Sequence, residues 1–157
     1  MTIGRGLGSL LMMGACGLVS ASACRRDTSG PVAEDSSAPT VVLAGEFERV
    51  AKSAQGRAEI VRRGDQFELR LRQVRVDSKR PVRVYLVGVD RAPTTRSVAS
   101  AELKYDMATL DQTVAEQIIA LPSEPDPRIR SVVLWEPTFY VNLAFAPLRP
   151  PGGEAEH

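Results

Sequence analysis

The sequence predicts an all-β fold, an antiparallel sandwich or a jelly-roll-like barrel of about seven or eight short strands. Three observations predict it. Apolar and charged residues alternate with a period of two along several short segments, which is typical of half-buried antiparallel strands. Clusters of Gly, Pro, Asp and Ser separate these segments at regular intervals. The stretch that carries the pattern, 40–148, has the length of one domain.

The first half of this domain contains three alternating segments. Their apolar positions are Val41, Leu43, Gly45 and Phe47, then Ala58 and Ile60, and then Phe67, Leu69 and Leu71. Glu46 and Glu48 lie opposite the apolar positions of the first segment, and charged residues alternate with those of the other two, so we expect each segment to bury one face and expose the other. The turn after the second segment is expected at Gly64 and Asp65, and a longer break runs from Asp77 to Pro81.

The second half is more apolar. Residues 82–89 and 132–135 are apolar at nearly every position, as expected of central strands that are buried on both faces. A last alternation is formed by Phe139, Val141, Leu143 and Phe145. One segment differs, because Leu103, Met107, Leu110, Val114 and Ile118 fall at helical spacing. Periodicity alone therefore predicts a helix there.

The N-terminus predicts export. One basic residue, Arg5, precedes an uncharged run that ends in small residues at position 23, as in a secretory signal peptide. A transmembrane anchor is the alternative, but Gly, Ser and Ala dilute the run too much for a convincing span of ~30 Å of hydrocarbon. We assign residues 1–23 to the signal peptide.

The residue that follows this run is Cys24. The sequence Ala21-Ser22-Ala23-Cys24 resembles the bacterial lipobox, in which small residues precede a cysteine that receives the lipid. An ordinary signal peptidase would also cleave after Ala23, and Cys16 is a further candidate for lipidation. Residues 24–39 are rich in Ser, Pro, Ala and charge, the composition of a flexible tether, and 149–157 read as a disordered tail. We expect a membrane-anchored lipoprotein of the cell envelope that faces the periplasm or the exterior, with a soluble periplasmic or secreted protein as the alternative.

The residue inventory limits the chemistry of the domain. The cysteines are Cys16 and Cys24, and His157 is the last residue of the chain. A Ser-His-Asp or Cys-His nucleophile therefore cannot be assembled inside the domain, nor can a zinc site of the usual Cys and His ligands. We expect a protein that is not an enzyme and that has no metal site and no cofactor.

Charge is distributed unevenly. Basic residues, mostly Arg, outnumber acidic ones between 49 and 83, and acidic residues are in excess after that. The candidate basic face consists of Arg57, Arg70, Arg72 and Arg83. It predicts either an anionic partner, such as phospholipid, polysaccharide or an acidic protein, or simply a solvated strand face. Nucleic acid is not expected, since no helix or aromatic platform accompanies the charge.

The domain also carries a series of short motifs in a fixed order. They are Gly45-Glu46-Phe47, Gly56-Arg57-Ala58, Phe67-Glu68-Leu69, Val84-Tyr85-Leu86, Met107-Ala108-Thr109-Leu110, Ala115-Glu116-Gln117, Leu121-Pro122, Arg130-Ser131-Val132-Val133-Leu134-Trp135, Phe139 and Phe145-Ala146-Pro147-Leu148. In this order and spacing they resemble the DM-thirteen family, also called the electron-transfer DM-thirteen domain. The resemblance covers 41–148 and implies a small extracellular β domain of the kind that occurs in bacterial lipoproteins and surface proteins.

The resemblance has two further implications. Residues 103–121 would be two strands around a turn near 112–114, and we expect this hairpin in place of the helix. The family's proposed redox role rests on a cysteine directly after the tryptophan, and the residue after Trp135 is Glu136. A carboxylate forms no disulfide and is a poor substitute for a thiolate towards soft metals. Trp135 and Glu136 are then either a core anchor and a strand end, or a ligand position at a mouth of the sandwich.

The sequence therefore predicts a non-catalytic binding or interaction module tethered to the bacterial cell envelope. The alternative that the resemblance implies is an accessory component of an envelope electron-transfer chain. The expected partners are the membrane, through the lipid anchor, and an anionic or protein component of the envelope.

Overall fold

The computed structural model describes residues 38–89 and 94–152. The predicted signal peptide, Cys24 and most of the predicted tether lie outside these ranges. Within them the chain forms β1 (Thr40–Glu46), β2 (Glu48–Arg49), β3 (Ala54–Arg63), β4 (Gln66–Val76), β5 (Arg83–Val87), α1 (Thr95–Ala99), β6 (Lys104–Thr109), β7 (Glu116–Leu121), β8 (Ser131–Glu136) and β9 (Val141–Pro147). The all-β class is confirmed.

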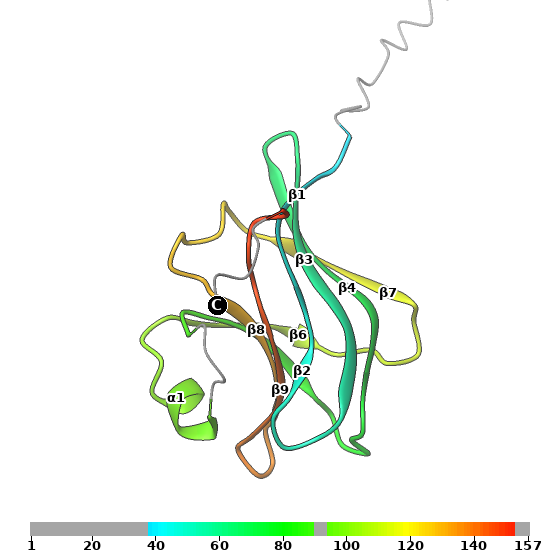
Figure 1. Ribbon diagram of the computed structural model, residues 1–157, viewed down its shortest axis with the longest axis vertical. Helices are drawn as coiled ribbons and strands as arrows, with labels where there is room; N and C mark the ends of the chain where they lie inside the picture. Colours follow the sequence, from blue (N-terminus) through cyan, green and yellow to red (C-terminus); the bar gives the residue numbers. More distant parts are fainter. Residues whose placement is uncertain (1–37, 90–93, 153–157) are drawn as a thin grey trace, which may run out of the picture. The chain divides into compact units, whose positions relative to one another are not determined.

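The strands form two antiparallel sheets that pack face to face (Figure 1). The four-stranded sheet has the order β1-β3-β4-β7, and the five-stranded sheet has the order β2-β9-β8-β5-β6. Every pairing between strands is antiparallel. The described residues thus form an open sandwich, the first of the two architectures predicted, and not a closed barrel.

The main core lies between the two sheets. Ile60 of β3 and Leu69 of β4 are cross-strand partners and are completely buried. Val84, Val132 and Leu134 extend the same core from the five-stranded sheet. These are alternate residues of their strands, so the period of two in the sequence is the direct cause of this layer.

A second apolar cluster covers the other face of the five-stranded sheet. Val133 and Trp135 alternate along β8 with the main-core residues, so they point away from the four-stranded sheet. Val98 of α1 packs on this cluster. The prediction that 132–135 is buried on both faces is confirmed by β8, whereas β5 buries Val84, Leu86 and Val87 and leaves Arg83 and Tyr85 partly exposed.

The helix α1 was not predicted. The side chain of Thr94 accepts a hydrogen bond from the Ser97 amide at 3.1 Å, which is an N-cap, and the Asn142 amide donates to the Thr95 hydroxyl at 3.2 Å. The contact from Asn142 ties the helix to β9, where Val98 packs on the second cluster. No helix among the described residues is long and apolar enough to cross a membrane.

The segment 103–121 forms two strands, as the family resemblance implies, and not the helix that its periodicity indicates. The expected hairpin is nevertheless wrong, because β6 pairs with β5 and β7 pairs with β4, in different sheets. Ile118, one member of the helical stripe, lies opposite Arg70 on the outer face and is 53% exposed. The Gln117 side chain links the two strands, donating to the Thr109 carbonyl and accepting from the Asp111 amide, both at 2.9 Å.

The two sheets approach each other most closely where β1 crosses β9. Backbone hydrogen bonds join Ala44 and Arg149 in both directions, at 2.8 and 2.9 Å. A Cβ atom placed on the neighbouring Gly45 would overlap the backbone carbonyl of Pro147. This crossing therefore requires glycine at position 45, because a backbone carbonyl cannot rotate aside as a flexible side chain can.

We predict that Gly45→Ala lowers the free energy of unfolding by about 2 kcal/mol, since overpacking forces the backbones apart. Urea unfolding of the full chain, followed by Trp135 fluorescence, measures the change. Gly152→Ala is the control: a Cβ there meets nothing within 4 Å, so only the strain of its positive φ, roughly 1 kcal/mol, is expected. Equal losses in the two variants would show that the crossing tolerates a side chain.

Candidate functional site

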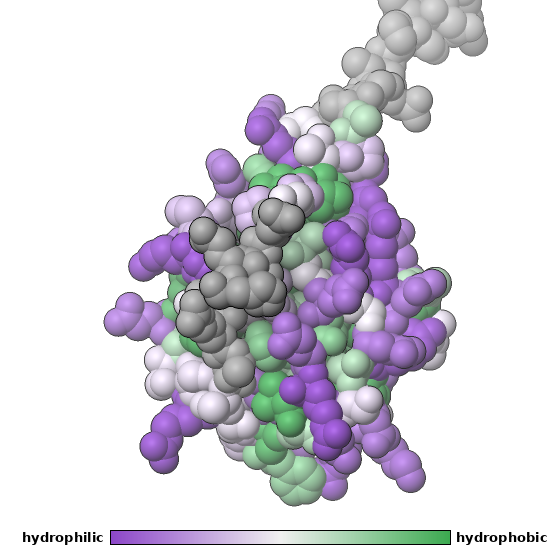
Figure 2. Space-filling model, viewed as in Figure 1, coloured by the Kyte–Doolittle hydropathy of each residue, from purple (hydrophilic) through white to green (hydrophobic). Residues whose placement is uncertain are grey.

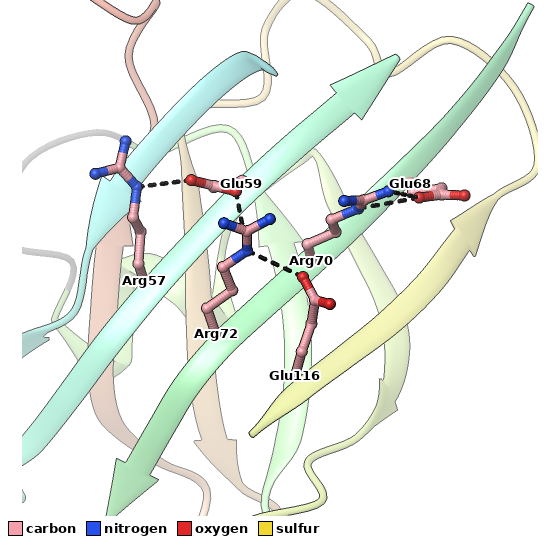
Figure 3. Close-up of polar contacts among 6 residues, drawn as sticks. All are labelled: Arg57, Glu59, Glu68, Arg70, Arg72 and Glu116. Atoms are coloured by element: carbon pink, nitrogen blue, oxygen red, sulfur yellow. Dashed lines mark hydrogen bonds and ion pairs between the residues drawn. The ribbon is translucent and has the colours of Figure 1, made fainter. Parts of the chain in front are cut away.

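Three of the four predicted basic residues lie together on the outer face of the four-stranded sheet (Figure 3). Arg57 of β3 is the cross-strand partner of Arg72 of β4, and Arg72 is the partner of Glu116 of β7. In the next register position, Glu59 lies opposite Arg70. The sheet thus aligns charged side chains from three strands in two neighbouring rows.

Glu59 is the centre of this cluster. Its side chain is only 7% exposed, and its Oε1 pairs with Arg57 Nε at 2.9 Å while its Oε2 lies 3.4 Å from Arg72 Nε. The buried Oε2 has no hydrogen-bond partner among the described residues, so the ion pair with Arg72 is its only compensation. Arg72 Nε also donates to Glu116 Oε1 at 2.9 Å. One buried carboxylate therefore holds two neighbouring guanidinium groups that would otherwise repel each other.

Arg70 is not part of an exposed basic surface. Its side chain is 9% exposed, and its Nε and Nη2 both donate to Glu68 Oε2, at 3.1 and 2.9 Å. Arg83 lies apart from the other three, on β5 of the other sheet, where it pairs with Asp106 at 2.6 Å and donates to Thr109. The face is therefore charge-compensated, and not the one-sign patch that the composition indicates.

The compensating glutamates were missed in the sequence analysis, although the signal for two of them was present. Glu59 follows Arg57 by two residues and Glu68 precedes Arg70 by two. Residues two apart in a strand share a face, so an ion pair within each of these two pairs could be predicted from the sequence. The contribution of Glu116 depends on which strand pairs with β4, and that is not readable from the local sequence.

An open groove of about 770 Å³ lies at one end of this face. Its lining includes Glu46, Gln55, Arg57, Arg72, Gln73 and Glu116. A bulge shapes it: between the pairs Gln55–Arg75 and Arg57–Arg72, one residue of β3 faces two residues of β4. Gly56 and Gln73 adopt positive φ at this point, 108° and 51°. The terminal nitrogens of Arg57 and Arg72 make no hydrogen bond within the described part of the chain, so the groove offers guanidinium donors beside carboxylate and amide groups.

Trp135 and Glu136 do not lie on this face. Trp135 is 5% exposed and packs edge-on against Tyr85, with ring centroids 6.3 Å apart, in the second apolar cluster. Burial, reinforced by the Asp106 carboxylate, raises the pKa of the Tyr85 hydroxyl above its ordinary value. Glu136 is also buried, and its Oε1 accepts a hydrogen bond from the Thr138 amide at 3.0 Å. The geometry thus gives Trp135 a packing role and Glu136 a role in the β8–β9 turn.

A second hollow, of about 470 Å³, lies where β6 and β7 separate. Its apolar lining includes Leu86, Met107, Leu121 and Ile129, all of which belong to the main core or pack on it. It is the open edge of that core, on the side opposite the β1–β9 crossing. In residues 38–89 and 94–152, no group of three or more Asp, Glu, His or Cys side chains is arranged to hold a metal ion.

Comparison of the chain with models of protein families, with curated proteins and with solved structures finds no match.

We predict that Glu59→Ala lowers the free energy of unfolding by roughly 2 kcal/mol, because it leaves Arg57 and Arg72 opposite each other without their shared carboxylate. Glu116→Ala, which removes a carboxylate that is 38% exposed, should lower it by less than about 1 kcal/mol. Denaturant unfolding of the two variants measures the difference. A larger loss of stability for Glu116→Ala than for Glu59→Ala would contradict the central role of Glu59.

Proposed function

We propose that this chain is a non-catalytic binding module of the bacterial cell envelope, tethered by lipid on Cys24, and that its groove binds an anionic group of an envelope partner. The observation that carries the proposal is the pair Arg57 and Arg72. Each is anchored through Nε to a carboxylate, and the terminal nitrogens of each have no partner within the described ranges.

This anchoring suits anion recognition. A guanidinium group that is held at Nε keeps a fixed plane, and its two terminal nitrogens can then donate together to a carboxylate or phosphate. Two such groups side by side share one buried negative charge, that of Glu59. Glu116 adds a second charge from the exposed edge strand β7, so an anionic ligand would compete with Glu116 for Arg72.

Two features of the sequence support the remainder of the proposal. The run that ends at Cys24 has the form of an export signal with a lipidation site. The described segments contain neither Cys nor His, so the usual nucleophile and general-base pairs cannot form from them. Binding without turnover is the function that this inventory favours.

The groove is tested by titrating the full chain with acetate, inorganic phosphate and glucuronate, while the arginine Nε–H resonances are followed by NMR. We expect one of these anions to shift the Arg57 and Arg72 signals. The double variant Arg57→Gln with Arg72→Gln should bind that anion at least about tenfold more weakly, a loss of about 1.4 kcal/mol.

The control is Arg62→Gln with Arg63→Gln, which removes the same charge from exposed positions at the far end of β3. Equal weakening of anion binding by both double variants would show that binding depends only on the net charge of the domain. Unchanged signals with all three anions would contradict an anion site.

Lipidation is tested separately. In cells that grow on labelled palmitate, the native chain should carry label and fractionate with membranes, and Cys24→Ser should lose the label and move to the soluble fraction. Cys16→Ser should change neither. Label that persists in Cys24→Ser would move the attachment site elsewhere.

A further inference from the structure

Three loops meet at the end of the sandwich opposite to the point where the chain enters β1. Thr40 pairs with Arg62 at the far end of β3, whereas the loop 50–53 precedes the start of β3. The Asp77 amide donates to the Ser53 carbonyl at 3.1 Å, which joins this loop to the loop 77–82. The guanidinium of Arg80 lies 4.2 Å from the ring centroid of Phe139, which joins that loop to the β8–β9 turn.

The surface formed there combines large aromatic side chains with cations. Phe139 and Tyr140 are 61% and 73% exposed, the two highest values among the large hydrophobic residues described. Lys52, Lys79 and Arg80 are exposed in the adjoining loops. We call these five residues the aromatic tip. The space-filling view shows hydrophobic surface at its lower end, where Figure 1 draws the β8–β9 turn, with hydrophilic side chains beside it (Figure 2).

The other charged groups at this end do not neutralise the tip. Asp77 is the exposed acid of the loop 77–82, and Glu136 is buried and holds the Thr138 amide. Glu48 and Arg49 of the short strand β2 offset each other. The charged residues of these loops therefore carry a net positive charge.

The backbone of the turn gives a second, independent observation. Tyr140 has φ of 55°, the left-handed region in which a bulky residue is unusual and Gly or Asn is favoured. A turn selected for stability alone would place a small residue there. The tyrosine is mostly exposed and has a strained backbone conformation, so packing within the domain does not explain it. A residue kept in this way indicates a role in binding.

We propose that the aromatic tip inserts into the interfacial region of an anionic phospholipid bilayer. Aromatic side chains favour the headgroup level of a membrane, and nearby Lys and Arg are attracted to anionic lipids. Phe139 and Tyr140 belong to the β8–β9 turn, which projects at the end of the sandwich (Figure 1), and they line neither of the two hollows described above. A polysaccharide would favour a groove or a flat platform with hydrogen-bonding groups, which makes the bilayer the better fit. This inference concerns a different surface from the groove and does not depend on it.

The test is flotation of the full chain with vesicles. The chain is synthesised in a cell-free system without membranes, so that Cys24 keeps its thiol, and is mixed with vesicles of phosphatidylcholine alone or with added phosphatidylglycerol. We expect more binding when phosphatidylglycerol is present. Phe139→Ser with Tyr140→Ser should lower binding about tenfold, and Lys79→Glu with Arg80→Glu should remove the dependence on phosphatidylglycerol.

The matched control is Arg62→Glu with Arg63→Glu, which makes the same charge change at the opposite end of β3 and should leave binding unchanged. All variants share one N-terminus, so binding through the apolar run of the signal segment adds the same background to each. The proposal is overturned if the aromatic variant binds vesicles as the native chain does, if the control loses binding as much as Lys79→Glu with Arg80→Glu, or if the tip instead retains the chain on purified peptidoglycan.

A further variant separates binding from folding. Tyr140→Gly should keep or raise the melting temperature, because glycine adopts the left-handed conformation without strain, yet lower vesicle binding. A lower melting temperature together with unchanged vesicle binding would make Tyr140 a structural residue and contradict the proposal.

Discussion

The register between β3 and β4 is the constraint on which the rest of the structure depends. Ile60 lies opposite Leu69, and both side chains are completely buried between the sheets. Because side chains alternate along a strand, this pairing places Glu59 opposite Arg70 on the outer face. A slip of β4 by one residue against β3 would put Arg70 in the core and expose Leu69. The apolar layer and the charged face are therefore two consequences of one register.

The groove depends on a local break in that register. The break can be seen in the sequence of β4. Leu71 and Val74 both face the core although they are three residues apart, whereas core-facing residues of a regular strand are two apart. The extra residue of β4 is absorbed near Gln73, and the positive φ of Gly56 lets β3 come close. A Cβ on Gly56 would lie 2.7 Å from the Arg72 carbonyl oxygen. The bulge thus bends the sheet next to the paired arginines and opens the space that a ligand could occupy.

The features that could be predicted from the sequence are those set by local interactions. Alternation predicted most strands, since it depends only on residues two apart. It could not show that β6 and β7 join different sheets, because that choice is made by distant strands. Alternation also placed the exposed Phe139 in the last strand, whereas it lies in the turn before β9, where Glu136 accepts the Thr138 amide. The basic residues were located, but their compensation by Glu116 needed the order β3-β4-β7. The resemblance to DM-thirteen domains stays a prediction.

The two proposals place geometric demands on the segment before β1. Chain entry and the aromatic tip lie at opposite ends of β3, which has 10 residues and is therefore about 33 Å long. The chain from Cys24 to Thr40 is roughly 16 residues, with a maximum reach of about 55 Å. A lipid on Cys24 could therefore lie in the same bilayer that the tip contacts. In that arrangement lipid and tip reinforce each other, since one acyl-type anchor and one weak interfacial site hold a protein better together than either does alone.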